Sequence, residues 1–590
     1  MKFKRARRAA RPLSKGARAL MDQTTEEAIR DILAELNIAL EPIEEDLDLP
    51  VEETDVNRAM AHHGLKDVVL TVRSMSGLAT VGLIEKSWLS GCPRCLQSRQ
   101  HGIEHFYDGL ASTAFDLQFA QDLVKAMHSR YGVAIAVTEA YDPQNWSVIA
   151  PVPFCSVCSD IEREFDDARV WNAPSMSSAA EQQIITTAGF RVIPPEVFVS
   201  RNRATVGFAA LIGNPVVVEQ SRACSLVNGP IIMADDPAEH EVAGGKGWLV
   251  EQSLASCVGE GLERYFTARP FRRRGMVAAR DELGPTVVDL LSDFGFPARD
   301  NTPGIEQYRD DLPIEWFLAD DLVNEQATWF PANLMFCPYL PPTGASVISA
   351  GSTNGAACGA TRQDATLQAL LELIERDAFW YYSRTGANPQ AVPWSLVPAD
   401  IISAMRSYGG SFRVQLLQSP FDLPVVQVTY DSDGGEAAST ARGTGATDSL
   451  GSSVRRAFTE CIQMLESLSS GQAVEECATD MRRLWYTGQS RSVFPNFFRE
   501  TTVMTEEAPW HFPDAQSLFK HIVAAAVRQE LGVYRIVIAE TQNFAVVRAA
   551  MSSISVMDGT YFMNNDRIAR FAEIVDQAPS TVNYSGSLFM

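Results

Sequence analysis

One segment in the middle of the chain carries polar residues at the spacing of a single helix face. Ser256, Glu260 and Glu263 lie four and three residues apart, and Arg264 follows directly. Because an α-helix turns once every 3.6 residues, these positions share one face. Carboxylate oxygens suit Mg²⁺, which usually takes further ligands from phosphate, and a nearby arginine neutralises phosphate oxygens. On one helix alone such a polar face is usually solvated, but together with similar faces on other buried helices it could contribute to a site for a metal–phosphate complex.

Two later segments repeat this pattern. The polar faces comprise Asp364, Gln368, Glu372 and Glu375 in residues 363–382, and Arg456, Glu460 and Gln463 in residues 452–468. The other residues of both segments, and of residues 249–266 around the first pattern, are mostly apolar, so we expect three helices that are buried on most sides. Buried acids need cations or other partners. Two interpretations stay open: the faces converge on Mg²⁺ ions that bridge a polyphosphate, or they form salt bridges with one another.

Two pairs of cysteines lie upstream of these segments. Cys92 and Cys95 form one CxxC motif, and Cys155 and Cys158 form another. A CxxC turn places two sulfurs at the separation that tetrahedral Zn²⁺ needs, and four thiolates leave no open coordination position. We therefore predict a structural zinc site made by these four cysteines. A disulfide, free buried cysteines and a thioredoxin-type redox motif are the alternatives.

Other nucleotide-binding and hydrolase motifs are absent from the sequence. The lysine of Gly244-Gly-Lys-Gly247 is not followed by Ser or Thr, so this is not a Walker A motif. The stretch Gly443-Thr-Gly-Ala-Thr-Asp448 breaks GxGxxG at its last position, and neither HExxH nor GxSxG occurs. We interpret Cys257 as a core residue, because no histidine partner is evident.

Composition and charge describe an acidic globular protein. The 590 residues are 46% apolar and 21% charged, with a formal net charge of −23. So acidic a chain is unsuited to coating a phosphate backbone, which argues against a nucleic-acid partner. Eight Lys and Arg residues gather in the first 18 residues, which we interpret as a flexible basic arm. No apolar run reaches the ~20 residues of a membrane span and no signal peptide is evident, so we expect a soluble, cytoplasmic protein without a membrane partner.

The predicted elements divide the chain into three parts. Residues 1–20 form the basic arm, residues 21–195 a zinc-binding domain, and residues 200–590 a domain of strands interleaved with long amphipathic helices. Within the zinc-binding domain, residues 67–84 are typical of two paired strands and residues 132–138 of a third. We therefore predict a mixed α/β (α+β) fold class.

The three polar patterns together resemble the YcaO family. Residues 256–264 (SCVGEGLER) match the family's Sx3ExxER nucleotide motif, and the GGKGW before them resembles its usual lead-in. Residues 352–380 resemble its second motif, which ends in ExxER-D, and Arg456 with Glu460 fits its third, an Rx3E pair. The resemblance covers about residues 200–590 and implies a YcaO-type ATP-binding domain.

This resemblance implies a reaction and a set of ligands. A Cys, Ser or Thr side chain of a precursor peptide attacks the preceding carbonyl, ATP phosphorylates the resulting oxyanion, and loss of phosphate leaves a thiazoline or oxazoline. By the same resemblance, the residues that would hold Mg²⁺ are Glu263, Glu372, Glu375 and Glu460. Those that would contact ATP also include Ser256, Glu260, Arg264, Asp364, Gln368 and Arg456.

The N-terminal cysteines carry a second resemblance. GCPRCLQSR followed by another CxxC is similar to the zinc tetrathiolate of the E1-like partner subunit of thiazole/oxazole-modified microcin (TOMM) cyclodehydratases. Only about 200 residues precede the YcaO-like part, so we expect a truncated E1-like domain without a complete leader-binding region. The implied partners are a ribosomal precursor peptide, a separate leader-binding protein, a flavin-dependent azoline dehydrogenase and a second copy of the chain in a homodimer.

The chain departs from the family pattern in two places. The second motif, normally Sx6Ex3Q, has Ala357 and Asp364 in place of Ser and Glu. The C-terminal PxPxP of azoline-forming members is absent, since the sequence ends in PSTVNYSGSLFM. Two rival functions therefore stay open: another backbone chemistry of the family, such as thioamide or macroamidine formation, and a non-catalytic zinc scaffold that activates a second protein.

Overall fold

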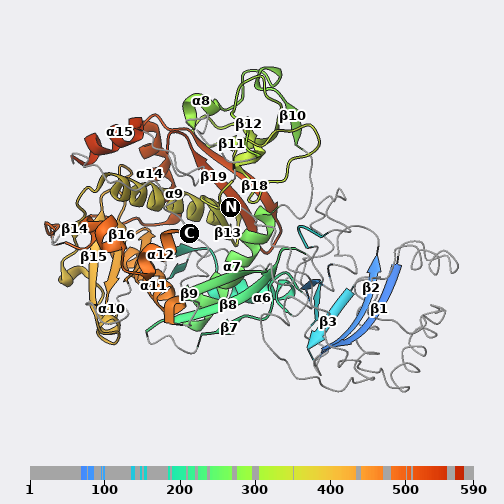
Figure 1. The fold of residues 1–590 in the computed structure, drawn as a ribbon, viewed down its shortest axis with the longest axis horizontal. Coiled ribbons are helices and arrows are strands. Elements are labelled where there is room, and N and C mark those ends of the chain that lie inside the picture. Colours follow the sequence, from blue (N-terminus) through green and yellow to red (C-terminus); the bar gives the residue numbers. More distant parts are fainter. Residues whose placement is uncertain are drawn as a thin grey trace. The chain divides into compact units, whose positions relative to one another are not determined.

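The computed structural model describes most of the chain after residue 188 and short stretches before it (Figure 1). The described residues are 68–75, 78–85, 95, 98–99, 135–139, 146–148, 152–155, 184–186, 189–207, 210–218, 223–234, 240–268, 275–294, 304–349, 351–432, 440–469, 480–499, 501–505, 509–554 and 565–576. They belong to two compact units. The first unit comprises Met1–Val170, Ala204–Asn214 and Pro230–Glu241, and the second comprises Trp171–Arg203, Pro215–Gly229 and Val242–Met590.

The first unit contains a four-stranded antiparallel sheet. Its strands, in spatial order, are β1 (Val68–Met75), β2 (Leu78–Glu85), β3 (Ile135–Glu139) and β4 (Trp146–Val148). β1 and β2 pair along their whole length, which confirms the two strands predicted in residues 67–84. Arg99 of this unit is fully buried, and its Nη1 donates to the carbonyl oxygens of Ala210 at 2.9 Å and Leu211 at 3.3 Å. Ala210 and Leu211 therefore contact an N-terminal residue of the same unit.

Two antiparallel sheets dominate the second unit. The six-stranded sheet has the order β10 (Met276–Ala278), β11 (Ile314–Asp321), β18 (Val533–Glu540), β19 (Ala545–Met551) and β13 (Ala356–Gly359), with β12 (Gln326–Pro331) also paired to β11. The four-stranded sheet has the order β14 (Gln390–Ala391), β15 (Ser411–Leu417), β16 (Val425–Asp431) and β17 (Thr440–Ala446). Smaller sheets are formed by β5 (Ile184–Thr186) with β6 (Gly189–Arg191), and by β7 (Val216–Val217), β8 (Ser225–Ile232) and β9 (His240–Gly247).

The three predicted helices are all present in the second unit. They are α7 (Val250–Thr267), α9 (Arg362–Thr385) and α11 (Leu450–Ser469). The other helices are α6 (Pro195–Arg201), α8 (Leu290–Asp293), α10 (Ala399–Arg406), α12 (Asp480–Tyr486), α13 (Ser490–Val493), α14 (Ala515–Arg528) and α15 (Asn565–Val575). The 3.6-residue periodicity thus identified these three helices correctly, with ends that differ by one to three residues.

Helix α9 lies at the centre of the second unit (Figure 1). It packs against β13 and β19 of the six-stranded sheet and against β17 of the four-stranded sheet, so nearly every side of it is buried. The Thr361 hydroxyl accepts a hydrogen bond from the Asp364 N–H at 3.2 Å and caps its first turn. Gly386 ends it in the left-handed conformation, at φ 64°. A helix fixed at both ends and buried all round is a rigid support for site residues.

Helix α11 packs very closely on strand β17. A Cβ at Gly443 would lie 2.2 Å from the Ala457 carbonyl oxygen and 2.3 Å from the Cys461 nitrogen, so no larger residue fits there. This strand contains the first four residues of the incomplete GxGxxG stretch. The first glycine of that stretch therefore has a packing role.

The predicted mixed α/β fold class is confirmed by these antiparallel sheets and their covering helices. The predicted boundaries at residues 20 and 195–200 stay predictions, and the basic arm lies outside the described residues. Among the helices that the structure describes, none is long and apolar enough to cross a membrane.

Candidate functional site

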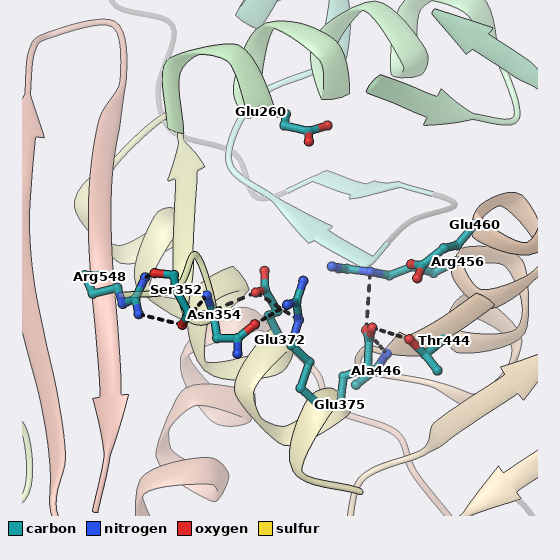
Figure 2. A network of polar contacts seen from close by, with 12 residues as sticks. Glu260, Ser352, Asn354, Glu372, Glu375, Thr444, Ala446, Arg456, Glu460 and Arg548 are labelled. Carbon is teal, nitrogen blue, oxygen red and sulfur yellow. Dashed lines mark hydrogen bonds and ion pairs between the residues drawn. The ribbon is translucent and has the colours of Figure 1, made fainter. Parts of the chain in front are cut away.

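Side chains from α9 and α11 meet in a network of polar contacts, and the acids of α7 lie near it (Figure 2). Figure 2 shows Glu372 and Glu375 on α9, Arg456 and Glu460 on α11, and Glu260 on α7. The helices are separated by 94 residues of sequence (268–361) and 64 residues (386–449), so their meeting is a property of the fold. The arrangement consists of two carboxylate pairs and the cations around them.

Glu375 and its ligands form the most buried part of the network. The Thr444 hydroxyl donates to Glu375 Oε1 at 2.7 Å, and the Ala446 N–H donates to Oε2 at 3.1 Å. Arg456 Nε lies 3.8 Å from Oε2. Burial raises the pKa of Glu375, the Arg456 guanidinium opposes this shift, and Glu460 adds to it. The carboxylate is therefore oriented by β17 and faces the cation on α11.

Glu460 has a partner that the sequence analysis did not identify as a site residue. Lys246 Nζ donates to Glu460 Oε2 at 2.7 Å, and both side chains are about one-quarter exposed. Burial alone would raise the pKa of Glu460, but Lys246 and then Arg442 hold it below its usual value. Lys246 is flanked only by glycines in the GGKG lead-in. A single charged residue among glycines was the feature of the sequence that could have marked it as a site residue.

Glu263 and Glu372 form the second carboxylate pair. Glu372 Oε1 accepts from the Gly355 N–H at 3.2 Å and lies 3.2 Å from Arg376 Nε. Glu263 makes no ion pair with any residue that the structure describes. Burial and the neighbouring Glu372 carboxylate raise the pKa of Glu263 well above its usual value. Two acids of this kind fit a divalent cation, which would relieve their mutual repulsion.

Glu260 ties helix α7 to the lead-in strand β9. Its Oε2 accepts from the Gly244 N–H at 3.0 Å, and its Oε1 accepts from Arg264 Nη2 at 3.2 Å. Ser256, one turn earlier on α7, is half-buried and has no recorded side-chain hydrogen bond within the described chain. One residue of the first motif, Glu260, thus bonds to the lead-in that precedes the motif. The contact of Ser256 with a nucleotide stays a prediction.

Asp364 and Gln368 lie at the N-terminal end of α9. Asp364 Oδ2 accepts from the Ala360 N–H at 3.1 Å, so this carboxylate stabilises the start of the helix. Burial raises the pKa of Asp364, and Arg191 opposes the shift. Gln368 Oε1 accepts from Arg456 Nη1 at 3.4 Å, which joins α9 to α11. The sequence analysis missed Arg191, because the short strand β6 that carries it has no motif.

The cysteines of the first unit are described only in part. Cys95 and Cys155 are fully buried, and the Val152 N–H donates to Cys95 Sγ at 3.2 Å. Cys95 of the first motif therefore lies next to Val152, three residues before Cys155 of the second. Cys92 and Cys158 lie outside the described residues. Within the described residues, no three His, Cys, Asp or Glu side chains form a ready-made metal cage.

The sequence that forms this site matches a known protein family. Residues 244–554 match the family model described as YcaO cyclodehydratase, ATP- and Mg²⁺-binding. An uncharacterised protein of Methanothermobacter thermautotrophicus is 28% identical over 275 residues, which cover 44% of this chain and 68% of that protein.

Solved structures share the fold. A heterocyclase in complex with substrate and cofactor aligns with a TM-score of 0.66 at 17% identity, over 91% of this chain and 79% of that one. The heterocyclase TruD aligns with a TM-score of 0.54 at 15% identity, over 92% of this chain and 78% of that one. The family model spans more than half of the sequence, including all three helices of the site. The chain therefore belongs to the YcaO family.

Proposed function

We propose that this protein is an ATP-dependent cyclodehydratase that converts Cys, Ser or Thr residues of a ribosomally made precursor peptide to thiazolines or oxazolines. The observation that carries the proposal is the convergence of α7, α9 and α11 on two carboxylate pairs with Lys246 and Arg456 beside them. Membership of the YcaO family and the shared fold with heterocyclases support it.

The carboxylates are the proposed Mg²⁺ ligands. Glu263, Glu372, Glu375 and Glu460 offer only oxygen donors, which are what Mg²⁺ prefers. Because no three acids of the described chain form a cage, each ion would take few protein ligands and complete its shell with phosphate and water. Mg·ATP, when bound, supplies the phosphoryl group that makes the peptide amide oxygen a leaving group.

The other polar residues of the site have supporting roles in the proposal. Arg456 and Arg264 neutralise phosphate oxygens, and Ser256, Glu260, Asp364 and Gln368 complete the proposed nucleotide contacts. Glu375 stays fixed by Thr444 and Ala446, so its carboxylate does not have to reorganise when the nucleotide binds.

The test is ATP consumption with precursor peptide, together with the mass loss of about 18 Da that each ring formation causes. Glu375→Gln keeps the size of the side chain and should lower ATP consumption about 100-fold or more. Glu540→Gln is the matched control, because Glu540 pairs with Arg362 at a partly exposed position away from the network. Equal ATP consumption by Glu375→Gln and wild type would refute the assignment of the site.

We further propose that residues 21–195 form a truncated E1-like zinc-binding domain. Cys92, Cys95, Cys155 and Cys158 would hold one structural zinc, and burial of Cys95 beside the Val152 N–H supports this. Structural zinc contributes on the order of 10 kcal/mol to the folding of such sites. We expect one zinc per chain by elemental analysis, lost together with solubility in Cys95→Ser. A zinc-free wild-type protein would contradict the proposal.

The proposed peptide substrate requires delivery, because Cys, Ser and Thr occur in every peptide. A separate leader-binding protein, docked on residues 21–195, would raise the effective concentration of the substrate to roughly millimolar. We expect reconstitution with such a protein to raise the rate of the 18 Da mass losses. Full activity of the isolated chain, unchanged by the partner, would contradict this part of the proposal.

A further inference from the structure

Strand β19 carries a buried arginine behind the acid pair Glu263–Glu372. Arg548 is fully buried, and its neighbours across the strands are Ala356 and Ile536. It forms no ion pair with the residues that the structure describes, and its Nε has no hydrogen-bond partner there. A buried guanidinium that lacks an ion pair is unfavourable, and the Glu372 and Glu263 carboxylates act on its charge only from a distance.

The bonds that Arg548 does make go to a single residue. Its Nη1 donates to the Ser352 carbonyl oxygen, and its Nη2 donates to the Ser352 hydroxyl at 3.3 Å. The same hydroxyl accepts from the Asn354 N–H at 3.3 Å. Arg548 therefore fixes the loop of residues 351–355, which leads into β13 and α9.

That loop continues to the acid pair (Figure 2). The Asn354 side-chain oxygen accepts from Arg376 Nη1, and Arg376 Nε lies 3.2 Å from Glu372 Oε1. Gly355 donates its N–H to the same oxygen at 3.2 Å. Gly355 has φ 78°, and a Cβ there would lie 2.5 Å from the Ala549 carbonyl oxygen, so the loop has one tightly packed conformation.

We propose that Arg548 is a positioning residue for Glu372, acting through Ser352, Asn354 and Arg376. The inference rests on the proposed function, in which Glu372 holds Mg²⁺. Residues that orient a metal ligand change metal affinity or activity about 10- to 100-fold when they are replaced. The buried charge of Arg548 is then retained because it fixes the loop that holds the Glu372 carboxylate.

The experiment is calorimetric binding of a non-hydrolysable ATP analogue at a series of Mg²⁺ concentrations. Arg548→Met should raise the Mg²⁺ concentration for half-maximal binding about 10-fold or more, and Arg548→Lys should fall between Met and wild type. Val547→Ala, at the adjacent buried position of β19, is the control for lost stability and should leave the Mg²⁺ dependence unchanged.

Ser352→Ala removes one link of the network at little risk to the fold, and should shift the Mg²⁺ dependence in the same direction by a smaller factor. An unchanged Mg²⁺ dependence in Ser352→Ala and in folded Arg548→Met would overturn the inference while leaving the proposed function intact. Failure of the wild-type protein to bind the analogue at any Mg²⁺ concentration would overturn the proposed function, and this inference with it.

Discussion

The two carboxylate pairs of the site carry the same formal charge but are neutralised differently. The pair Glu375–Glu460 has Lys246 at 2.7 Å from one acid and Arg456 at 3.8 Å from the other. In the pair Glu263–Glu372, Arg376 forms an ion pair with Glu372. Arg264 and Arg376 also oppose the shift at Glu263, but burial and the Glu372 carboxylate still raise its pKa well above the usual value. One half of the site is thus balanced by the chain itself, and the other half favours an added cation.

The largest effect on ATP consumption should follow from removing a cation from Glu375–Glu460, the pair whose charge the chain itself neutralises. Lys246→Met removes the ammonium that pairs with Glu460 and leaves the two acids with only the arginines near them, Arg456 at Glu375 and Arg442 at Glu460. We expect ATP consumption to fall about 10- to 100-fold, the range for a residue that supports a metal ligand. The exposed Lys520→Met is the control and should behave as wild type. Normal ATP consumption by Lys246→Met would show that the balance of charge in this pair has no bearing on the reaction.

A sharper comparison uses the same substitution in both pairs of the metal-free protein. Glu263→Gln removes a carboxylate that is destabilised by burial and by Glu372, so the free energy of unfolding at neutral pH should rise. Glu460→Gln weakens the ion pair with Lys246, so it should lower that free energy by about 1 kcal/mol. Denaturant unfolding in a chelating buffer measures both. Shifts of the same sign would refute the difference between the pairs.

Part of this site could be predicted from sequence. Helical spacing put the polar residues of α7, α9 and α11 on single faces, and those faces do meet. Spacing alone left the Mg²⁺-nucleotide and salt-bridge interpretations open, and both have a basis in the structure. Arg456–Glu375 is an ion pair between helices. In the pair Glu263–Glu372, the two acids repel each other strongly enough that the pKa of Glu263 stays raised despite Arg264 and Arg376.

The other residues of the site could not be predicted, because their contacts join segments that are far apart in the sequence and no residue spacing marks them. Lys246 reaches Glu460 across 214 residues of sequence, and Arg548 reaches Ser352 across 196. Each stands alone among small or apolar residues, so no periodic pattern marks it. Thr444 could not be assigned for a similar reason: its contact with Glu375 requires β17 to lie beneath α9, which is a property of the sheet order.

The pH dependence of stability should also differ between the pairs. An acid whose folded pKa is raised, as for Glu263, keeps its proton in the folded state where the unfolded state has lost it. The contribution of Glu263 to the free energy of unfolding therefore falls as pH rises from about 4.3, the usual pKa of glutamate, through the raised pKa of the folded state. The lowered pKa of Glu460 has the opposite effect, with stability lost as pH falls below about 4.3. Unfolding of Glu263→Gln in chelator should show a smaller decline above that pH than wild type, and an equal decline would contradict the assignment.

The smallest effect concerns the hydrogen bond that orients the balanced pair. Thr444→Val keeps the shape of the strand residue and removes the donor to Glu375 Oε1, while the Ala446 N–H and Arg456 still hold the other oxygen. We expect a loss of about 1 kcal/mol in unfolding free energy and a fall in ATP consumption of less than about 10-fold.

The matched control is Thr366→Val on α9, whose hydroxyl, within the described residues, bonds only to the Arg362 carbonyl oxygen of its own helix. In a double-mutant cycle, Thr444→Val should have little further effect on ATP consumption once Glu375→Gln is present, because the two side chains act as one unit. Fully additive effects would mean that Thr444 stabilises the sheet without orienting Glu375.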